Sequence, residues 1–158
     1  MTESTVTKSA AELQQLVRQV LEAAGASASN AEIVAQHVVA ANLSGVDTHG
    51  VWQVPRYVGA IKSGEIVPTA SPAVVKETAT SGLVTGNWTF GQVAARFAME
   101  VAIGKAAAQG VAVVGLVQSH HTGRLGALPD PGRAPRAHAA PGASARRVAA
   151  RGAAALRR

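Results

Sequence analysis

Apolar residues recur at helical spacing in three stretches of the first half of the chain, and this period predicts three amphipathic helices. The first stretch follows Ser9 and Glu12, whose spacing is typical of a capping box, and it ends at Gly25. Ser29 and Glu32 repeat the capping-box spacing and predict where the second helix begins. The apolar positions that carry the two patterns are Leu13, Leu16, Val17, Val20, Leu21 and Ala24, then Ile33, Val34, Val38 and Ala41.

The third helical pattern follows Asp47 and Thr48 and ends at Gly64. Its apolar face consists of Val51, Val54, Val58 and Ile61. Pro55 lies inside this pattern, and proline cannot donate the backbone hydrogen bond of a helix interior. We therefore expect a kink or an interrupted first turn at this point.

Beyond Pro68 the period changes to one that is typical of strands. Two short runs of β-prone residues, Ala73–Thr78 and Gly82–Thr85, are joined by a tight polar turn and predict a hairpin. A helix then begins at Phe90-Gly91-Gln92 and ends at Gly110.

The run Val111–Val117 is apolar almost throughout, which predicts a strand that is buried on both faces. One hairpin and one interior strand do not complete a sheet. We therefore predict a mixed α/β (α+β) fold class, with a helical N-terminal region at residues 1–68 and the beginning of an incomplete α/β domain at residues 69–126.

The composition excludes several classes of protein. The chain of 158 residues contains no cysteine, which excludes a disulfide framework, a thiolate metal site and a cysteine nucleophile. No apolar run approaches the ~18 residues that a membrane span needs, and the polar N-terminus lacks an apolar signal segment. We expect a cytoplasmic protein without a membrane partner.

The positive charge is confined to the C-terminal end. Residues 127–158 carry seven of the 15 basic residues and one of the nine acidic residues, so the net charge of +6 resides there. Alanine, arginine, glycine and proline fill 26 of these 32 positions. A tail of this kind can bind nucleic acid or an acidic partner. The alternative is that this segment is a GC-rich gene translated out of frame. Alanine, arginine, glycine and proline are the residues whose codons can begin with only G and C, so such a reading frame yields this composition. In either case the tail has too few apolar residues to form a core.

Asp47-Thr48-His49-Gly50 is the first segment with candidate chemistry. A histidine in the first turn of a helix lies at the positive end of the helix dipole, which favours its neutral form. The N–H groups of that turn also suit a carboxylate ligand, so His49 is a candidate general acid–base residue beside an anionic substrate. In the alternative interpretation, Asp47 or Thr48 caps the helix and His49 is an ordinary surface residue.

His120 and His121 follow the predicted strand, at the edge where α/β sheets bind ligands. Adjacent histidines point in different directions, and no further ligand stands at a metal-binding spacing from them, so the sequence predicts no metal site. The alternative is a pair of ordinary loop histidines.

Phe90-Gly91-Gln92 could present backbone amides to a ligand, and the alternative is a tight turn between a strand and a helix. None of the 16 glycines forms a G-x-G-x-x-G motif, and no Walker-type loop occurs. A dinucleotide would therefore bind here without a Rossmann fingerprint.

The run ANLSGVDTHGVWQVPRYV at Ala41–Val58 is followed in order by Gly64–Pro68, Thr89–Gln92 and Ser119–Gly126. This ordered set resembles the type-2 malate/L-lactate dehydrogenase family, which includes ureidoglycolate, sulfolactate and diketogulonate oxidoreductases. The resemblance covers about residues 8–128. It implies a helical region, a nucleotide-binding domain that is not a Rossmann fold, and a homodimer.

The reaction that the resemblance implies is reversible hydride transfer between NAD or NADP and a 2-oxo or 2-hydroxy acid. His49 would give a proton to the carbonyl oxygen during reduction, and His121 corresponds to a second pocket histidine that some members use as a base. Thr48, Gln53 and Tyr57 would bind the substrate, and the cofactor-binding residues are expected beyond residue 126. Many members have an arginine at the position of Gln53, which supplies hydrogen bonds but no charge. Arg56 is the nearest cation in the sequence.

Members of the family are more than twice as long as this chain, and they continue into an acidic, alanine-rich helix where this chain has its basic tail. We therefore expect that the coding sequence is truncated or frameshifted after about codon 127, that another reading frame encodes the remainder, and that this chain is inactive alone. The alternative function is a basic-tailed protein that binds nucleic acid or an acidic partner. Only five aromatic residues occur in the chain, too few for a base-stacking platform, so a nucleic-acid partner is disfavoured.

Overall fold

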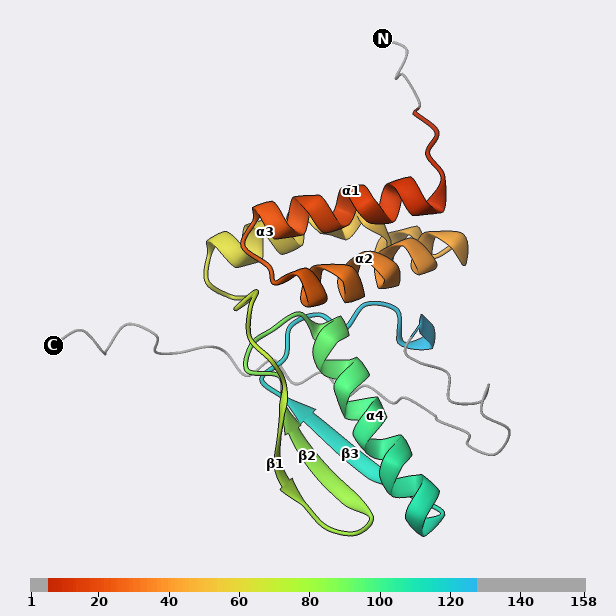
Figure 1. Cartoon of the computed structure of the whole chain (residues 1–158), viewed down its shortest axis with the longest axis vertical. Helices are drawn as coiled ribbons and strands as arrows, with labels where there is room; N and C mark the ends of the chain where they lie inside the picture. The colour runs from red at the N-terminus through yellow and green to blue at the C-terminus, as the bar shows by residue number, and fades with distance from the viewer. Residues whose placement is uncertain (1–5, 128–158) are drawn as a thin grey trace, which may run out of the picture.

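The computed structural model describes residues 6–127, which form two parts that lie one above the other (Figure 1). Three helices pack together in one part, and the fourth helix lies across a sheet in the other. The helices are α1 (Ala10–Ala23), α2 (Ala28–Leu43), α3 (Val54–Lys62) and α4 (Gly91–Gln109). The strands are β1 (Ala73–Glu77), β2 (Ser81–Thr85) and β3 (Val113–Val117). The predicted α/β fold class is confirmed, and no helix of the described residues is long and apolar enough to cross a membrane.

Capping side chains decide where α1 and α2 begin. The Ser9 hydroxyl accepts a hydrogen bond from the N–H of Glu12 at 3.3 Å, and the Glu12 carboxylate accepts one from the N–H of Ser9 at 2.8 Å. The capping box predicted for α1 is therefore confirmed. The prediction that Ser29 caps the second helix is wrong, because the cap lies two residues earlier: the Ser27 hydroxyl accepts from the N–H of Asn30 at 3.3 Å.

The third predicted helix is divided into three pieces. Two single 3-10 turns, η1 (Asp47–His49) and η2 (Val51–Gln53), precede α3. Pro55 lies in the first turn of α3, where the missing N–H of proline removes no hydrogen bond. The interruption predicted from Pro55 is confirmed. His49 consequently lies in a 3-10 turn and not in the first turn of an α-helix.

The sheet has the strand order β1-β2-β3. β1 and β2 form the predicted antiparallel hairpin, and β3 pairs parallel with β2. The chain crosses from β2 to β3 through α4, since a parallel pair requires a long connection. Lys105 ties α4 to the hairpin, because its Nζ lies 2.8 Å from Oε2 of Glu77 and donates to the carbonyl oxygen of Thr78 at 2.7 Å.

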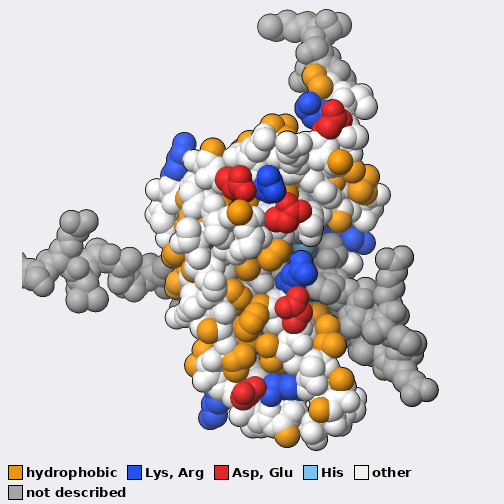
Figure 2. All heavy atoms as spheres, viewed as in Figure 1, with side chains coloured by type: hydrophobic (Ala, Val, Ile, Leu, Met, Phe, Trp, Pro, Cys, Tyr) orange, Lys and Arg blue, Asp and Glu red, His pale blue; other side chains and the backbone are white. Residues whose placement is uncertain are grey.

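The prediction that Val111–Val117 is buried on both faces is wrong for this structure. Exposed and half-exposed residues alternate along β3, and the Val113 side chain is 71% exposed. The reason is that α4 packs against one face of β3, and the side chains that point to the opposite face are the exposed ones. On the face seen in Figure 2, hydrophobic side chains also gather over the half of the molecule that α4 and the sheet form.

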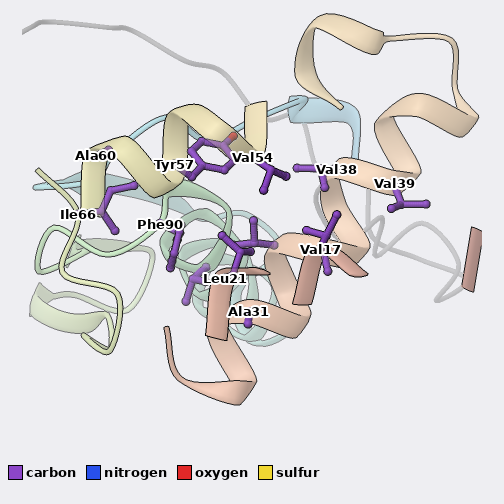
Figure 3. Close-up of a cluster of buried hydrophobic side chains, with 13 residues drawn as sticks. Val17, Leu21, Ala31, Val38, Val39, Val54, Tyr57, Ala60, Ile66 and Phe90 are labelled. Carbon is purple, nitrogen blue, oxygen red and sulfur yellow. The ribbon is translucent and has the colours of Figure 1, made fainter. Parts of the chain in front are cut away.

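The hydrophobic core lies among the three helices and extends to the start of α4. Leu21, Tyr57 and Phe90 are fully buried in it, and Figure 3 shows their side chains within one cluster. The rings of Tyr57 and Phe90 meet edge to face, with centroids 6.2 Å apart. Phe90 directly precedes α4, so this contact joins the helical part to the sheet part.

The predicted domain boundary between residues 68 and 69 stays a prediction. Apart from Ala127, the basic tail at residues 127–158 lies outside the described residues.

Candidate active site

The turn between α2 and α3 presents His49, and Asn42 holds this turn. The Asn42 Nδ2 donates to Oδ1 of Asp47 at 2.6 Å, and its Oδ1 accepts from the N–H of Val51 at 2.8 Å. Gly50 packs so closely against the same amide that a Cβ at this position would overlap it. One side chain therefore fixes both ends of the turn that carries the first candidate histidine.

Thr48 and Gln53, which the sequence predicts to bind substrate, lie beside His49. The Thr48 Oγ1 is 3.1 Å from Nδ1 of His49, and the Gln53 Nε2 donates to the carbonyl oxygen of Thr48 at 2.6 Å. The Gln53 Oε1 is buried and has no hydrogen-bond partner within the described residues. Both side chains therefore support the His49 turn, and their contact with a substrate stays a prediction.

The loop after β3 carries His120 and His121 and passes directly over the start of α4. Gly91, the first residue of α4, lies so close to the carbonyl oxygens of both histidines that a Cβ would overlap them. This close approach explains the glycine in Phe90-Gly91-Gln92 and favours the tight-turn interpretation of that segment.

A chain of hydrogen bonds leads from α4 to His121. The Gln92 Nε2 donates to the Tyr57 hydroxyl at 2.6 Å, and the same hydroxyl lies 3.0 Å from Nδ1 of His121. Figure 3 shows the hydroxyl oxygen of Tyr57 on the side of the ring away from Leu21 and Phe90. The Tyr57 side chain is 0% exposed, and burial raises the pKa of its hydroxyl. The structure therefore gives Tyr57 a supporting place behind His121, and direct contact with a substrate stays a prediction that this arrangement does not favour.

The two predicted catalytic histidines lie side by side, although they come from different parts of the fold. The ring centroids of His49 and His121 are 5.4 Å apart, and the rings are tilted by 30°. Burial lowers the pKa of His121, and the charges of His49, Arg56 and His120 lower it further. The structure thus joins the two candidate segments into one site with a neutral His121 near pH 7.

His120 turns away from this pair. Its ring meets Tyr57 edge to face with centroids 6.4 Å apart, and its Nε2 lies 3.7 Å from Oε2 of Glu65. Burial and the charge of Arg56 lower the pKa of His120, and Glu65 opposes them. The positive charge of Arg56 therefore contributes to the lowered pKa values of both His120 and His121.

His37 also borders the site, and the sequence analysis did not assign it a role. The side chain is 7% exposed, and its Nε2 has no hydrogen-bond partner within residues 6–127. A Cβ at Gly123, in the loop that carries His121, would overlap this nitrogen. Burial, and then the charges of His121, Arg124 and His49, lower the pKa of His37 to about 4. Its place one turn after the buried Val34, on the apolar face of α2, was the available signal.

Gln92 and Asn42 were also missed as functional side chains. Gln92 lies in the segment considered for its backbone amides, Asn42 lies in the run that carries the family resemblance, and nothing local to either residue reveals the partner of its side chain. No group of three or more potential metal ligands occurs in the described part of the chain.

Together these elements define an α/β protein in which two histidines pair where a helical part meets the loop after a parallel strand. A sequence model of the malate/L-lactate dehydrogenase family matches residues 8–131. The chain belongs to the malate/L-lactate dehydrogenase family.

Similar proteins include hydroxycarboxylate dehydrogenase B of Escherichia coli (strain K12), which is 39% identical over 114 residues, 72% of this chain and 32% of that protein. A malate/(S)-sulfolactate dehydrogenase of Methanothermus fervidus is 39% identical over 119 residues, 75% of this chain and 35% of the relative. The chain therefore spans about a third of the length of these relatives.

Solved structures agree with this assignment. A putative malate/lactate dehydrogenase from E. coli superposes with a TM-score of 0.74 at 37% identity and covers 77% of this chain and 34% of its own. The sulfolactate dehydrogenase of Methanocaldococcus jannaschii gives a TM-score of 0.72 at 35% identity, with 74% and 34% covered. The helical part and the opening of the sheet thus recur in enzymes that are about three times as long as the matched region.

Proposed function

We propose that residues 8–126 form the proton-transferring part of the active site of an NAD(P)-dependent 2-hydroxy acid dehydrogenase. The single observation that carries this proposal is the pairing of His49 with His121, whose ring centroids lie 5.4 Å apart. Relatives named malate, sulfolactate and hydroxycarboxylate dehydrogenases support the substrate class, since each of these names denotes a hydroxy acid.

Reduction of a 2-oxo acid needs a hydride at the carbonyl carbon and a proton at the carbonyl oxygen. NADH or NADPH, when bound, supplies the hydride. In the proposal, His49 gives the proton during reduction and takes it back during oxidation, which is the role of a general acid–base residue. Thr48 and Gln53 hold the turn that carries His49, so they keep the imidazole in place for this transfer.

The substrate carboxylate requires a positive or hydrogen-bonding anchor. Arg56 lies one residue before Tyr57 in α3, and its positive charge lowers the pKa values of His120 and His121. Gln53 uses one N–H of its amide on Thr48 and keeps the other for a ligand. Arg56 and Gln53 are therefore the proposed carboxylate anchors, in place of the arginine that the resemblance leads us to expect at position 53.

The described residues do not form a site that fits a nicotinamide dinucleotide. The start of α4, the candidate for binding through backbone amides, is closed by the carbonyl oxygens of His120 and His121. We assign no residue of this part of the chain to the cofactor. NAD or NADP, a homodimeric assembly and a cytoplasmic location therefore stay proposals for a protein of the relatives' full length.

The test supplies the other two thirds of the relatives' length from one of them. Residues 8–126 of this chain replace the matched segment of E. coli hydroxycarboxylate dehydrogenase B, and oxidation of NADH or NADPH by 2-oxo acids is followed by absorbance. We expect turnover by the chimera and a loss of at least ~100-fold in its His49→Ala variant, in line with the removal of a general acid. Trp52→Ala is the matched control, because Trp52 is 80% exposed and its side chain makes no hydrogen bond or ring contact within residues 6–127, so turnover should be nearly unchanged.

Equal activity in the folded His49→Ala chimera would overturn the role of His49. The 158-residue chain alone should show no measurable turnover. Turnover by that chain would overturn the proposal that it needs the remaining part of the relatives' length.

A further inference from the structure

We propose that Gln92 is a positioning residue. It acts through the Tyr57 hydroxyl and determines which ring nitrogen of His121 carries the proton. The direction of the hydrogen bonds from Gln92 to Tyr57 and from Tyr57 to His121 is inferred from the structure alone. The consequence of this direction for catalysis rests on the proposed function.

The direction of these two hydrogen bonds follows from the donors and acceptors that each group offers. The Gln92 Nε2 has only N–H donors, so at 2.6 Å the Tyr57 oxygen accepts from it. The Tyr57 hydroxyl keeps its own proton, and Nδ1 of His121, 3.0 Å away, is the acceptor within reach. An Nδ1 that accepts is not protonated, so a neutral His121 carries its proton on Nε2.

Burial prevents water from replacing either link. Gln92 is 1% exposed and Tyr57 is 0% exposed. The reverse order of hydrogen bonds would need the Gln92 amide to turn by half a rotation. In the observed order the buried Oε1 lacks a partner within the described part of the chain, and in the reverse order the N–H donors would lie at that position instead. Buried N–H groups without a partner are rarer in folded proteins than carbonyl oxygens without one, which favours the observed order.

The lowered pKa of His121 supports the same conclusion, because a neutral ring has a tautomer to be fixed. With the proton on Nε2, His121 offers a hydrogen-bond donor at that nitrogen and cannot accept a proton there. The two histidines of the site therefore differ in role: His121 donates a hydrogen bond, and His49 is the acid–base group. This assignment departs from the base that the resemblance allows at His121.

Nuclear magnetic resonance of the 158-residue chain, labelled with ¹⁵N in its histidines, tests the proposal directly. Long-range ¹H–¹⁵N correlations distinguish the two neutral tautomers, and the loss of one set of signals in His121→Gln assigns the ring. In the wild-type chain above the pKa of His121, we expect the tautomer with the proton on Nε2. A wild-type spectrum with the proton on Nδ1 would overturn the proposal.

Gln92→Glu is the informative variant, because an ionised carboxylate can only accept, and its spectrum is recorded at a pH at which the introduced carboxyl has lost its proton. The Tyr57 hydroxyl should then donate to it and accept from Nδ1 of His121, so the two nitrogen signals of this ring should exchange positions. Gln109→Glu, the same change at the exposed end of α4, should leave them unchanged. An unchanged His121 tautomer in a folded Gln92→Glu variant would overturn the proposal.

Tyr57→Phe provides a second route if Gln92→Glu does not fold. It removes the hydroxyl that connects Gln92 to His121 and should convert one tautomer into a mixture, whereas an unchanged tautomer would contradict the proposal. These spectra need neither substrate nor cofactor. If the His121 tautomer changes in Gln92→Glu but the chimera is inactive, only the proposed function is overturned. If the chimera is active but the tautomer does not change, only the positioning role of Gln92 is overturned.

Discussion

The imidazole rings of His49 and His121 lie side by side, tilted by 30°, with their centroids 5.4 Å apart, and the two residues come from different parts of the fold. Two positive charges at this separation repel each other, so a proton on one ring opposes a proton on its neighbour. The pair therefore holds one proton more readily than two, which suits the passage of a single proton to or from a substrate.

This coupling predicts that His49→Ala raises the pKa of His121. Burial is the largest cause of the lowered pKa of His121 and stays in the variant, while the charge of His49 is the next cause and disappears. The shift is measured by a pH titration of the His121 ring signals in the 158-residue chain. Trp52→Ala changes the same turn without removing a charge and should leave the pKa where it is. An unaltered pKa in His49→Ala would show that the two rings do not interact.

Because His37 is buried, we predict that the free energy of unfolding decreases in acid. The pKa of His37 is lowered from 6.5 to about 4, so the folded protein keeps it neutral over a range in which the unfolded chain takes up a proton. The free energy of unfolding should therefore fall as the pH falls from 6.5 to about 4, by at most ~1.4 kcal/mol per pH unit, and His37 contributes no further change outside this window.

Urea unfolding on both sides of the window checks this prediction. His120 and His121 also have lowered pKa values, so the contribution of His37 is the difference between the wild type and His37→Gln. The variant should lose less stability on acidification. Identical pH dependences would contradict the prediction.

We predict that replacing glycine by alanine has opposite effects on stability at two positions of α4. A Cβ at Gly91 would overlap the carbonyl oxygens of His120 and His121, so Gly91→Ala must displace the loop and should cost about 1–3 kcal/mol. A Cβ at Gly104 meets nothing within 4 Å, so Gly104→Ala should raise stability by up to ~1 kcal/mol through helix propensity. Thermal unfolding measures both. Equal midpoints for the two variants would show that α4 does not begin against the histidine loop.

The Asn42–Asp47 contact predicts a reciprocal rescue. Asn42→Asp brings two carboxylates together at a distance where an amide now donates to a carboxylate at 2.6 Å, and it should cost about 1–3 kcal/mol. Adding Asp47→Asn restores one amide and one carboxylate to the pair, and the new carboxylate can still accept from the N–H of Val51. The double variant should regain part of the lost stability in chemical unfolding. A loss equal to the sum of the two single variants would show that the pair is not coupled.

The sequence predicts those parts of the fold that depend on neighbours along the chain. The Ser9–Glu12 capping box, the turn at Pro55 and the hairpin each involve residues a few positions apart, and the structure contains all three. The misplaced cap at Ser29 shows the limit of this local information, because Ser27 satisfies the same N-terminal groups two residues earlier.

Features that depend on distant residues were not predictable in the same way. The burial of Val111–Val117 is set by whatever lies beside the strand, and an apolar run alone does not reveal that. Gln92 reaches Tyr57 across 35 positions of the chain, and His37 faces a loop that follows the last strand. Both His49 and His121 were candidates from the sequence, while their pairing became visible only in three dimensions.

The outer edge of β3 has a consequence for the behaviour of the chain in solution. Within residues 6–127 the N–H and C=O groups of this edge face no partner strand, and the sequence of β3, VVGLV, contains no charge or proline to repel one. Such an edge is a template on which another extended segment can add. Two molecules of this chain present the same strand edge to each other. The rate of their association should therefore rise with the square of the protein concentration, and dilution should lengthen the lifetime of the monomer.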